Sequence, residues 1–406
     1  MTTITDVACT VCGCVCDDLT VTIDDGRIVN AERACILAAP WFAGQNGHAP
    51  AVAEIDGKPA SLDDAIYRAA AILREAKSPL VYGLSRSTTE GQRTAVALAD
   101  RLGATIDTTA ATGHAPSLMA LQQVGESTCS LGEVKTRGDL VIYWAANPEV
   151  THPRHIERYV RTDNRTLVVA SNEANATTAI ADRFIRIETG RDWEALWTLR
   201  GMIKGVLPRE GDLGWLADKM MNCRCGIVFF GTALTRGPLG HRQVEALLQL
   251  VTDLNSHGRF YARRLRRLGD VAGADSVLTW QTGYPFAVNF ARGYPIYNPG
   301  EFSGPEMLAR GEVDACLFVG SETSVDFPDE ALRALTRIPV IALESPGTVT
   351  PFPAAVRFTT AVYGVHRPGT AYRMDEVPIP LRVLLPTDYP SDGDVLTRLL
   401  NQLSVE

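Results

Sequence analysis

The chain has 406 residues, 46% of them hydrophobic and 21% charged, which is the composition of a globular protein too long for one ordinary core. Its formal net charge of −8 at pH 7 argues against nucleic acid as the main partner. The N-terminus lacks the pattern of a signal peptide, and no apolar run reaches the length of a membrane span. We therefore expect two or three domains in a cytoplasmic protein whose cysteines stay reduced.

Five cysteines lie close together near the N-terminus. Cys9, Cys12, Cys16 and Cys35 have the spacing Cys-x2-Cys-x3-Cys with a fourth thiol downstream, which suits one soft metal ion or a cubane iron–sulfur cluster. Cys14 alternates with its neighbours, so we expect it to face away from such a centre. The alternative is a set of buried thiols that bind nothing. The sequence predicts metal or cluster binding and leaves this alternative open.

The segment between these cysteines predicts a small hairpin. Residues 18–30 alternate apolar and polar side chains on either side of the turn Asp24-Asp-Gly26. Such a hairpin would bring Cys16 and Cys35 towards each other.

The rest of the chain alternates predicted strands and helices, which is typical of parallel sheets with crossover helices. Ser61 is a suitable N-cap for the first helix, and Gly103 follows the second as a C-terminal cap. Helices are predicted at 61–76, 90–102, 241–254 and 393–403, and buried strands at 80–83, 105–107, 139–144, 166–170, 184–187, 226–231, 313–320 and 338–343.

Ligands of open α/β sheets bind at the carboxyl ends of strands. Asn147, Ser171, Gly231 and Gly320 follow predicted strands at such ends. The sequence carries no phosphate-binding loop, dinucleotide fingerprint, zinc-protease motif or nucleophile elbow, so these positions are interpreted as plain strand-to-loop turns.

Two further features of the sequence, a pair of histidines and a loop rich in aromatic residues, do not by themselves assign a function. His152 and His155 bracket Pro153-Arg154, and as a lone pair in a loop they are interpreted as scaffolding rather than as metal ligands. The stretch 284–302 is rich in Gly, Pro and Tyr, which favours an ordered loop at a subunit interface or beside a large ligand.

Together these pieces resemble the B subunit of formylmethanofuran dehydrogenase, in the molybdopterin oxidoreductase superfamily, along nearly the whole chain. The motifs that carry the resemblance are the cysteine set ending in Cys16-Asp-Asp, Gly103-Ala-Thr-Ile-Asp107, Cys129-Ser-Leu-Gly-Glu-Val-Lys135, Tyr143-Trp-Ala-Ala-Asn-Pro148, His152-Pro-Arg-His155, Arg292-Gly-Tyr-Pro295, Tyr297-Asn-Pro-Gly-Glu-Phe302 and Gly369-Thr-Ala-Tyr-Arg-Met-Asp375.

The resemblance implies a molybdopterin-oxidoreductase-like α/β fold of parallel-sheet domains with a small Cys-rich N-terminal lobe. The domains expected are residues 1–50 with part of 356–406, residues 51–115 with 300–355, and residues 116–299. In that family the N-terminal cysteines hold a [4Fe-4S] cluster, and two pterin–guanine dinucleotides hold tungsten or molybdenum. That metal reduces carbon dioxide to formate, which is then condensed onto methanofuran by a partner subunit.

Three departures from the family pattern affect the predicted function. The family's metal ligand is a Cys or selenocysteine directly before His-Gly-Pro, and here Gly113 stands at that position. Where the superfamily has Asp-x-Arg to hold a guanine, this chain has Ala170-Ser-Asn-Glu173, and Val325-Asp-Phe-Pro328 lacks the family's His before Phe-Pro. His114 and Arg292 match active-site residues and Asn147 a cofactor-binding residue, so all three are interpreted as relicts.

This pattern resembles the B subunit of the bacterial formyltransferase/hydrolase complex of methylotrophs. The chain is then expected to be a non-redox scaffold without molybdopterin, molybdenum or tungsten and without catalytic residues of its own. The complex would transfer formyl from formyl-tetrahydromethanopterin to methylofuran and release formate in C1 (formaldehyde) oxidation. Its partners would be the other three subunits, amidohydrolase-like A, C and formyltransferase D, which would hold methylofuran.

Two alternatives remain open. The chain could be the active tungsten or molybdenum subunit, with a substitute ligand for Gly113 from Thr112 or His114. It could instead be an iron–sulfur electron-transfer protein. The metal and pterin content of the purified protein distinguishes these functions.

Overall fold

The computed structural model describes residues 1–47, 50–160, 165–237 and 239–404. Residues 48–49 of the predicted N-terminal lobe and the last two residues of the C-terminal region lie outside this range. The chain folds as two compact units, Met1–Thr112 with Leu268–Glu406 (unit 1) and Gly113–Arg267 (unit 2). None of the helices in the described part of the chain is long and apolar enough to cross a membrane.

Unit 1 is built on a mixed sheet that has nine strands within the described residues. Its five central strands are parallel, and antiparallel strands extend the sheet at both edges. In spatial order the strands are β14 (Ile296–Tyr297), β13 (Val288–Asn289), β7 (Thr105–Thr108), β6 (Pro79–Gly83), β15 (Ala315–Val319), β16 (Val340–Glu344), β17 (Val356–Thr359), β4 (Ala53–Ile55) and β5 (Lys58–Ala60).

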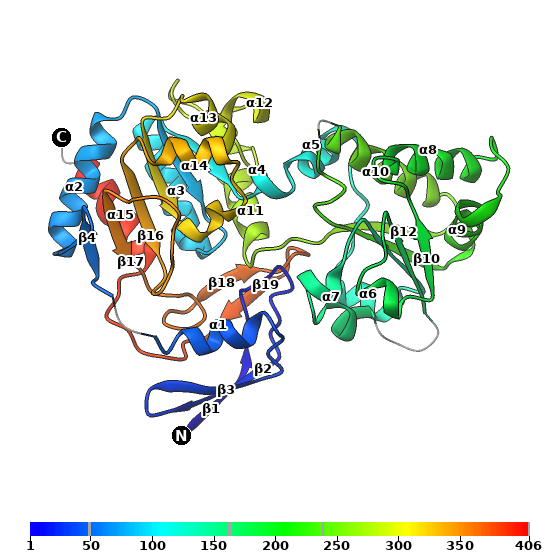
Figure 1. Cartoon of the computed structure of the whole chain (residues 1–406), viewed down its shortest axis with the longest axis horizontal. Helices are drawn as coiled ribbons and strands as arrows, with labels where there is room; N and C mark the ends of the chain where they lie inside the picture. Colours follow the sequence, from blue (N-terminus) through cyan, green and yellow to red (C-terminus); the bar gives the residue numbers. More distant parts are fainter. Residues whose placement is uncertain (48–49, 161–164, 238, 405–406) are drawn as a thin grey trace. The chain divides into compact units, whose positions relative to one another are not determined.

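Both faces of this sheet are buried, because successive side chains of a strand point to opposite faces. In β6, Val81 belongs to one core, and Leu80 and Tyr82 belong to the other. The first core is covered by α2 (Leu62–Glu75), α3 (Thr89–Leu102), α11 (Val271–Thr282) and α15 (Asp392–Ser404), and the second by α13 (Gly304–Arg310) and α14 (Asp329–Leu335) (Figure 1). The short helices α12 (Pro299–Phe302) and the 3-10 helix Ser321–Asp326 complete the unit.

The predicted helix ends of unit 1 are confirmed. The hydroxyl of Ser61 accepts a hydrogen bond from the backbone N–H of Asp64 at 3.1 Å, as an N-cap does. Gly103 follows α3 with a left-handed φ of 63°, which glycine adopts without strain. Residues 268–299, which the sequence placed in the second α/β domain, lie in unit 1, because α11 packs on α3 and β13 pairs with β7.

The cysteine-rich N-terminus forms a three-stranded antiparallel sheet of β1 (Thr2–Val7), β2 (Leu19–Asp24) and β3 (Arg27–Glu32), followed by α1 (Ala38–Gly44). The predicted hairpin is therefore confirmed, whereas β1 was not predicted. Ala8 and Val15 pack against a hairpin of β18 (Gly369–Tyr372) and β19 (Pro378–Leu381) near the C-terminal end, beside α1 (Figure 1). A separate N-terminal domain stays a prediction.

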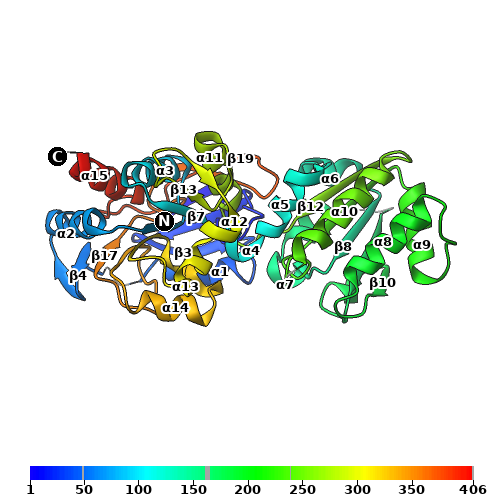
Figure 2. The same ribbon diagram turned by 90° about the horizontal axis from the view of Figure 1, so that it is seen from above.

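Unit 2 contains a parallel sheet that has five strands within the described residues, flanked by helices on both faces (Figure 2). The strands are, in spatial order, β10 (Arg183–Arg186), β9 (Thr166–Ser171), β8 (Leu140–Trp144), β11 (Cys225–Phe230) and β12 (Arg259–Arg264). The helices are α5 (Ala115–Val124), α6 (Leu131–Arg137), α7 (Pro148–Thr151), the π-helix Ile156–Val160, the 3-10 helix Thr178–Ile180, α8 (Asp192–Ile203), α9 (Gly211–Asn222) and α10 (Gly240–Leu254).

A buried carboxyl group joins three segments of unit 1. Asp107 in β7 is fully buried and accepts hydrogen bonds from the backbone N–H groups of Thr108 (2.9 Å), Ala287 (3.0 Å) and Gly304 (2.7 Å). Burial raises the pKa of this carboxyl to about 7. The edge of the sheet and the start of α13 are therefore both anchored on one side chain.

We expect Asp107→Ala to lower the free energy of unfolding by about 2–5 kcal/mol, because each buried N–H that loses its acceptor costs about 1–3 kcal/mol. Urea denaturation at pH 7 measures this change. Asp100→Ala, at an exposed position on α3, serves as the control and should shift stability by no more than about 0.5 kcal/mol. Equal small effects of both substitutions would contradict the anchoring role.

Candidate functional site

The order of strands creates one switch point in each unit, the place where open α/β sheets bind ligands. In unit 1 the chain runs from β6 to β7 on one side and later places β15 on the other side of β6. In unit 2 it runs from β8 through β9 to β10 and then places β11 on the opposite side of β8. A cavity lies at the carboxyl ends of the strands at each of these two points.

Backbone strain marks both switch points. Leu84 directly follows β6 with a φ of 75°, and Ala145 directly follows β8 with a φ of 47°. A left-handed conformation is unfavourable for residues with a side chain and concentrates at functional sites. Only glycine fits at Gly83, the last residue of β6, because a Cβ there would come within 2.3 Å of the Val319 carbonyl oxygen.

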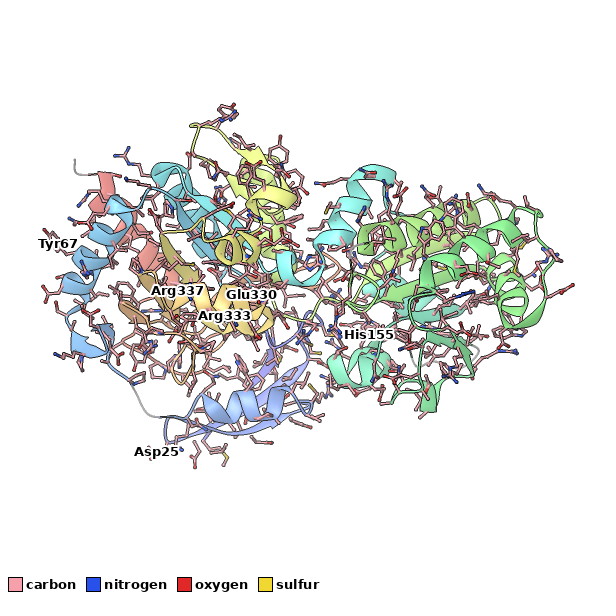
Figure 3. All side chains as sticks on the ribbon, turned by 45° about the horizontal axis from the view of Figure 1, so that its top comes forward. Asp25, Tyr67, His155, Glu330, Arg333 and Arg337 are labelled. Atoms are coloured by element: carbon pink, nitrogen blue, oxygen red, sulfur yellow. The ribbon has the colours of Figure 1, made fainter. Side chains whose placement is uncertain are left out.

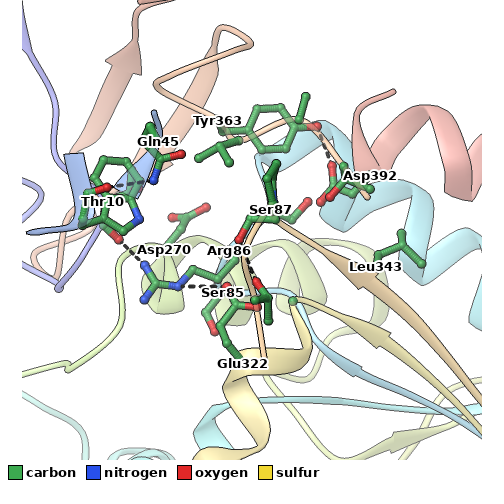
Figure 4. A pocket seen from close by; sticks show the side chains of 18 of the residues that line it. Thr10, Gln45, Ser85, Arg86, Ser87, Asp270, Glu322, Leu343, Tyr363 and Asp392 are labelled. Atoms are coloured by element: carbon green, nitrogen blue, oxygen red, sulfur yellow. Dashed lines mark hydrogen bonds and ion pairs between the residues drawn. The ribbon is translucent and has the colours of Figure 1, made fainter. Parts of the chain in front are cut away.

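The cavity of unit 1 has a volume of about 340 Å³ and is surrounded by the loops that follow β6, β15, β16 and β17, together with α1 (Figure 4). Gly320, which the sequence placed at a strand end, lines it. The guanidinium of Arg86 donates to the Thr10 carbonyl oxygen at 2.6 Å and lies 3.6 Å from a carboxylate oxygen of Glu322. Arg86 therefore connects this cavity to the cysteine-rich loop.

The carboxyl groups of Asp270, Glu322 and Asp392 line this cavity. Asp270 and Asp392 line it and are only 2% and 5% exposed. Burial raises the pKa of Asp270 to about 8, although the backbone N–H of Tyr372 and the side chain of Gln92 donate to it. Burial also raises the pKa of Asp392, which accepts a 2.6 Å hydrogen bond from the Tyr363 hydroxyl. Arg86 is the one basic side chain among the lining residues described, and Glu322 already lies beside it.

The cysteine loop is fixed to unit 1 at two points besides Arg86. A Cβ on Gly269 would come within 2.0 Å of the Thr10 carbonyl oxygen, so the two backbones pack directly against each other. The backbone N–H of Met374 donates to the Gly13 carbonyl oxygen at 2.8 Å. The loop is thus held by segments of unit 1 that lie more than 250 residues later in the chain.

Cys9, Cys12 and Cys16 are buried, and Cys35 is half-buried. Burial is the main cause that raises the pKa of the Cys9 thiol, while the backbone N–H of Val11 opposes it. A hydrogen bond with the Cys14 thiol is the main cause that lowers the pKa of Cys12. Backbone N–H groups that point at sulfur are typical of metal-bound thiolates.

That Cys14 faces away from a shared metal centre stays a prediction. Its side chain forms hydrogen bonds with the thiols of Cys12 and Cys16, which raise its pKa well above the usual value. The backbone N–H of Cys9 donates to the Cys16 carbonyl oxygen at 2.8 Å, which closes the loop that contains Cys12 and Cys14. Within the described residues, no three His, Cys, Asp or Glu side chains are arranged to hold a metal ion.

The cavity of unit 2, of about 280 Å³, is lined by Asn147, Ser171 and Gly231, the three other strand-end positions noted in the sequence. The Asn147 side-chain carbonyl accepts hydrogen bonds from the hydroxyl and the backbone N–H of Thr177 at 2.8 and 3.3 Å. Glu173, in the segment that replaces the superfamily's Asp-x-Arg, also lines it. The interpretation of these ends as plain turns stays a prediction, and the cavity makes them candidate ligand sites.

The two predicted scaffold histidines are buried in unit 2. The Nε2 atom of His152 lies 2.7 Å from the Arg266 carbonyl oxygen, and its Nδ1 atom lies 2.8 Å from the Thr151 hydroxyl. Burial lowers the pKa of His152 to about 4, so it is neutral at pH 7. The Nδ1 atom of His155 lies 2.8 Å from the Tyr143 hydroxyl, within an aromatic cluster (labelled in Figure 3).

The predicted relict residues lie at identifiable places in the two units. Gly113 is the last residue of α4 (Ala110–Gly113), and its carbonyl oxygen accepts a hydrogen bond from the Thr235 hydroxyl at 3.0 Å. A Cβ at Gly113 would have no atom within 4 Å, so the position has room for a side chain. His114 is 8% exposed and caps α5, and Arg292 is exposed in the turn after β13.

Sequence reasoning missed Arg86 and Asp270. Arg86 follows a predicted strand by three residues, so its place at a strand end could have been noticed. Asp270 precedes α11, which the weakly amphipathic segment 271–282 did not reveal, and its proximity to Gln92 depends on tertiary packing.

The fold is a mixed α/β architecture of the molybdopterin-enzyme class. It matches acetylene hydratase from Pelobacter acetylenicus with a TM-score of 0.71 at 12% identity, over 98% of this chain and 69% of that one. It also matches the formyltransferase/hydrolase complex of Methylorubrum extorquens, solved with methylofuran, with a TM-score of 0.74 at 26% identity, over 86% of this chain and 98% of that one. No protein-family model matches the chain.

Sequence similarity gives the family. The chain is 36% identical over 427 residues to the B subunit of the tungsten-containing formylmethanofuran dehydrogenase 2 of Methanocaldococcus jannaschii, and 32% identical over 426 residues to that of Methanococcus maripaludis, each over 98% of both chains. It therefore belongs to the B-subunit family of formylmethanofuran dehydrogenase and is part of an enzyme complex of this type.

The sequence motifs lead us to expect greater similarity to the bacterial B subunit than to the archaeal ones. Overall sequence similarity does not support this expectation. The B subunit of the formyltransferase/hydrolase complex Fhc of Methylorubrum extorquens is 26% identical over 274 residues, which cover 66% of this chain and 74% of that relative. Both archaeal subunits match with higher identity and over more of the chain.

The residues present do not fit a thiolate-bound metal–pterin group. The resemblance puts the family's metal ligand at position 113, where glycine offers no donor atom. The donor type of the four N-terminal thiols, by contrast, suits a cluster or zinc, with Cys9, Cys12, Cys16 and Cys35 as ligands.

We expect His152 to make stability depend on pH between about 4 and 6.5. The unfolded histidine takes up a proton near pH 6.5, whereas the folded one does so only near pH 4, so its stabilisation is complete above 6.5 and is lost as pH falls through this window. The loss is on the order of 3 kcal/mol. Denaturation of the native chain and His152→Gln between pH 4 and 7 measures the difference, which should shrink at low pH. His257→Gln, an exposed control, should leave the pH profile unchanged.

Proposed function

We propose that this chain is a non-redox B subunit in a complex that handles formyl groups on a furan-type carrier. The observation that carries the proposal is Gly113, which stands where the family has its thiolate or selenolate ligand. Soft sulfur or selenium ligation is the usual way to hold such metals, and glycine cannot supply it.

The surroundings of Gly113 support a loss of ligand rather than a rearrangement. A Cβ at this position would meet no atom within 4 Å, so a cysteine would fit without displacing any neighbour. Packing therefore does not explain the glycine. The altered segment 170–173 lies at the switch-point cavity of unit 2, so a second predicted cofactor contact has changed as well.

In this function the complex moves a formyl group from tetrahydromethanopterin to methylofuran and hydrolyses it to formate, during C1 (formaldehyde) oxidation. The chemistry belongs to the other three subunits, amidohydrolase-like A, C and formyltransferase D, and these partners hold methylofuran. This chain supplies a rigid scaffold. Its TM-score of 0.74 to the methylofuran-bound bacterial complex, over 98% of the matched chain, supports this role.

A second candidate is an active tungsten- or molybdenum-dependent formylmethanofuran dehydrogenase. The 36% and 32% identities to tungsten-containing archaeal subunits, over 98% of each chain, favour it over the first candidate at the level of the whole sequence. It requires a metal ligand other than residue 113, and Thr112 or His114 are the nearest side chains. Membership of a multi-subunit family speaks against a free-standing iron–sulfur electron carrier.

The N-terminal cysteines have a structural role in either candidate. Four metal–sulfur bonds would stabilise a segment whose own core, around Ala8 and Val15, is small. We propose that Cys9, Cys12, Cys16 and Cys35 hold a [4Fe-4S] cluster or zinc as a structural centre.

Metal and pterin analysis of the complex purified without oxygen distinguishes the two candidates. We expect less than about a tenth of an equivalent of tungsten or molybdenum per chain and no pterin fluorescence after oxidation, because the thiolate ligand is missing. An amidohydrolase-like partner should co-purify. Gly113→Cys should fold with unchanged stability and gain no formate dehydrogenase activity. Stoichiometric metal with pterin would instead establish the second candidate.

Cys12→Ser tests the N-terminal centre. We expect it to lower the iron or zinc content several-fold and the melting temperature of the protein by several degrees, while formyl hydrolysis by the complex continues. Cys316→Ser, at a buried core position of β15 far along the chain, is the matched control and should leave the metal content unchanged. Four titratable thiols at these positions in the denatured native protein, without metal, would refute the proposed centre.

A further inference from the structure

Two tryptophans stand exposed on the surface of unit 2. Trp193 and Trp197 lie one turn apart on α8, with side chains 45% and 44% exposed and ring centroids 5.8 Å apart. Residues at i and i+4 share one face of a helix, so the two indoles form a continuous apolar surface. Burying a tryptophan is strongly favourable, and a pair left in water calls for an explanation.

The apolar surface continues beyond the helix. A Cβ on Gly201, the next residue on the same face, would come within 2.8 Å of the Leu207 side chain, so Leu207 covers α8 at this turn. The backbone N–H of Val206 donates to the Gly201 carbonyl oxygen at 2.8 Å, which folds the segment back onto the helix. Val206 and Leu207 are 77% and 42% exposed. We call Trp193, Trp197, Val206 and Leu207 the tryptophan patch.

Charged side chains fix one side of this patch. The guanidinium of Arg200 lies over the Trp197 ring at 4.3 Å and is held by Asp253 at 2.8 Å and Gln249 at 2.6 Å. The patch is therefore ordered before any partner binds, which lowers the entropic cost of association.

The same edge carries excess positive charge. Lys204 is half exposed and lies 3.1 Å from Asp253, so one carboxylate faces two cations at this edge of the patch. A surface with carboxylates complements such an edge.

Residues 284–302, which the sequence favoured as an interface, leave less aromatic surface exposed for a partner. Tyr284 and Tyr297 stack on each other at 5.0 Å, and Phe286 is fully buried against Tyr297. Most aromatic surface of residues 284–302 is therefore used within unit 1, although Tyr294 remains 55% exposed. The tryptophan patch, by contrast, leaves much of its apolar surface exposed.

We propose that the tryptophan patch is the docking surface for another subunit of the complex, one whose contact face offers an apolar recess bordered by carboxylates. Tryptophan and arginine are the side chains that most often dominate binding energy at interfaces. The inference rests on the proposed function only in requiring that the chain assembles with other subunits.

Co-expression of the chain with its complex tests the docking surface. Trp193→Ala with Trp197→Ala should weaken association with the partner subunit roughly 30-fold or more, measured by titration of the purified components. Tyr67→Ala, at a more exposed aromatic on α2 of unit 1 (Figure 3), is the control and should bind like the native chain. Circular dichroism and thermal melting verify that the variants are folded.

A second variant keeps the test decisive if the tryptophan variant folds poorly. Lys204→Gln removes one cation from the edge and leaves Arg200 paired with Asp253, so it should fold normally and weaken association, with a smaller dependence on salt.

The three outcomes separate the inference from the proposed function. If the native chain assembles and both variants bind equally well, the docking surface is elsewhere and the proposed function stands. If the isolated native chain forms a dimer that the tryptophan variant abolishes, the patch joins two copies and the partner assignment is wrong. If the native chain binds no other subunit, the proposed function fails as well.

Discussion

The hydrogen bond from the Arg86 guanidinium to the Thr10 carbonyl oxygen, at 2.6 Å, joins the two parts on which the candidate site depends. On one side lies the turn between Cys9 and Cys12, and on the other the end of β6, at the switch point of the sheet. Gly269 closes the same contact, because its missing side chain lets the two backbones meet. The cysteine loop therefore takes its shape from the sheet of unit 1, and a metal bound there would stabilise a contact between distant segments rather than an isolated lobe.

The sheets and most of their helices could be predicted, because each leaves a local signal. Ser61 and Gly103 mark helix ends through capping, and the buried strands appear as short apolar runs between turns. The strands β13 and β14 and the helix α11 have weaker sequence patterns, so the predicted second domain extended past residue 267 to residue 299. Their membership of unit 1 depends on the pairing of β13 with β7 and on Asp107, which accepts hydrogen bonds from Ala287 and Gly304, contacts that no local pattern contains.

The candidate site shows the same division between local and tertiary information. Asn147, Ser171, Gly231 and Gly320 could be placed at strand ends, but only the strand order brings the first three to one cavity and the last to another. The resemblance to the family identifies Gly113 as the position of the family's metal ligand. The sequence does not reveal that a Cβ at this position would have open space around it. The contacts of Cys14 could not be read from the sequence either. Alternation along the chain does not show that its thiol hydrogen-bonds with the thiols of Cys12 and Cys16.

Whole-chain identity and single residues point to different chemistries within one family, and physical reasoning explains how both can hold. The identity to the archaeal subunits extends over 98% of each chain, as expected for proteins that share a fold. A metal centre depends on its donor atoms, and a glycine at position 113 leaves no packing cavity, since a Cβ there would have no atom within 4 Å. The carboxyl groups of Asp270 and Asp392 have structural partners of their own, because they accept hydrogen bonds from Tyr372, Gln92 and Tyr363. An architecture kept without a donor atom at position 113 is what the proposed non-redox function requires.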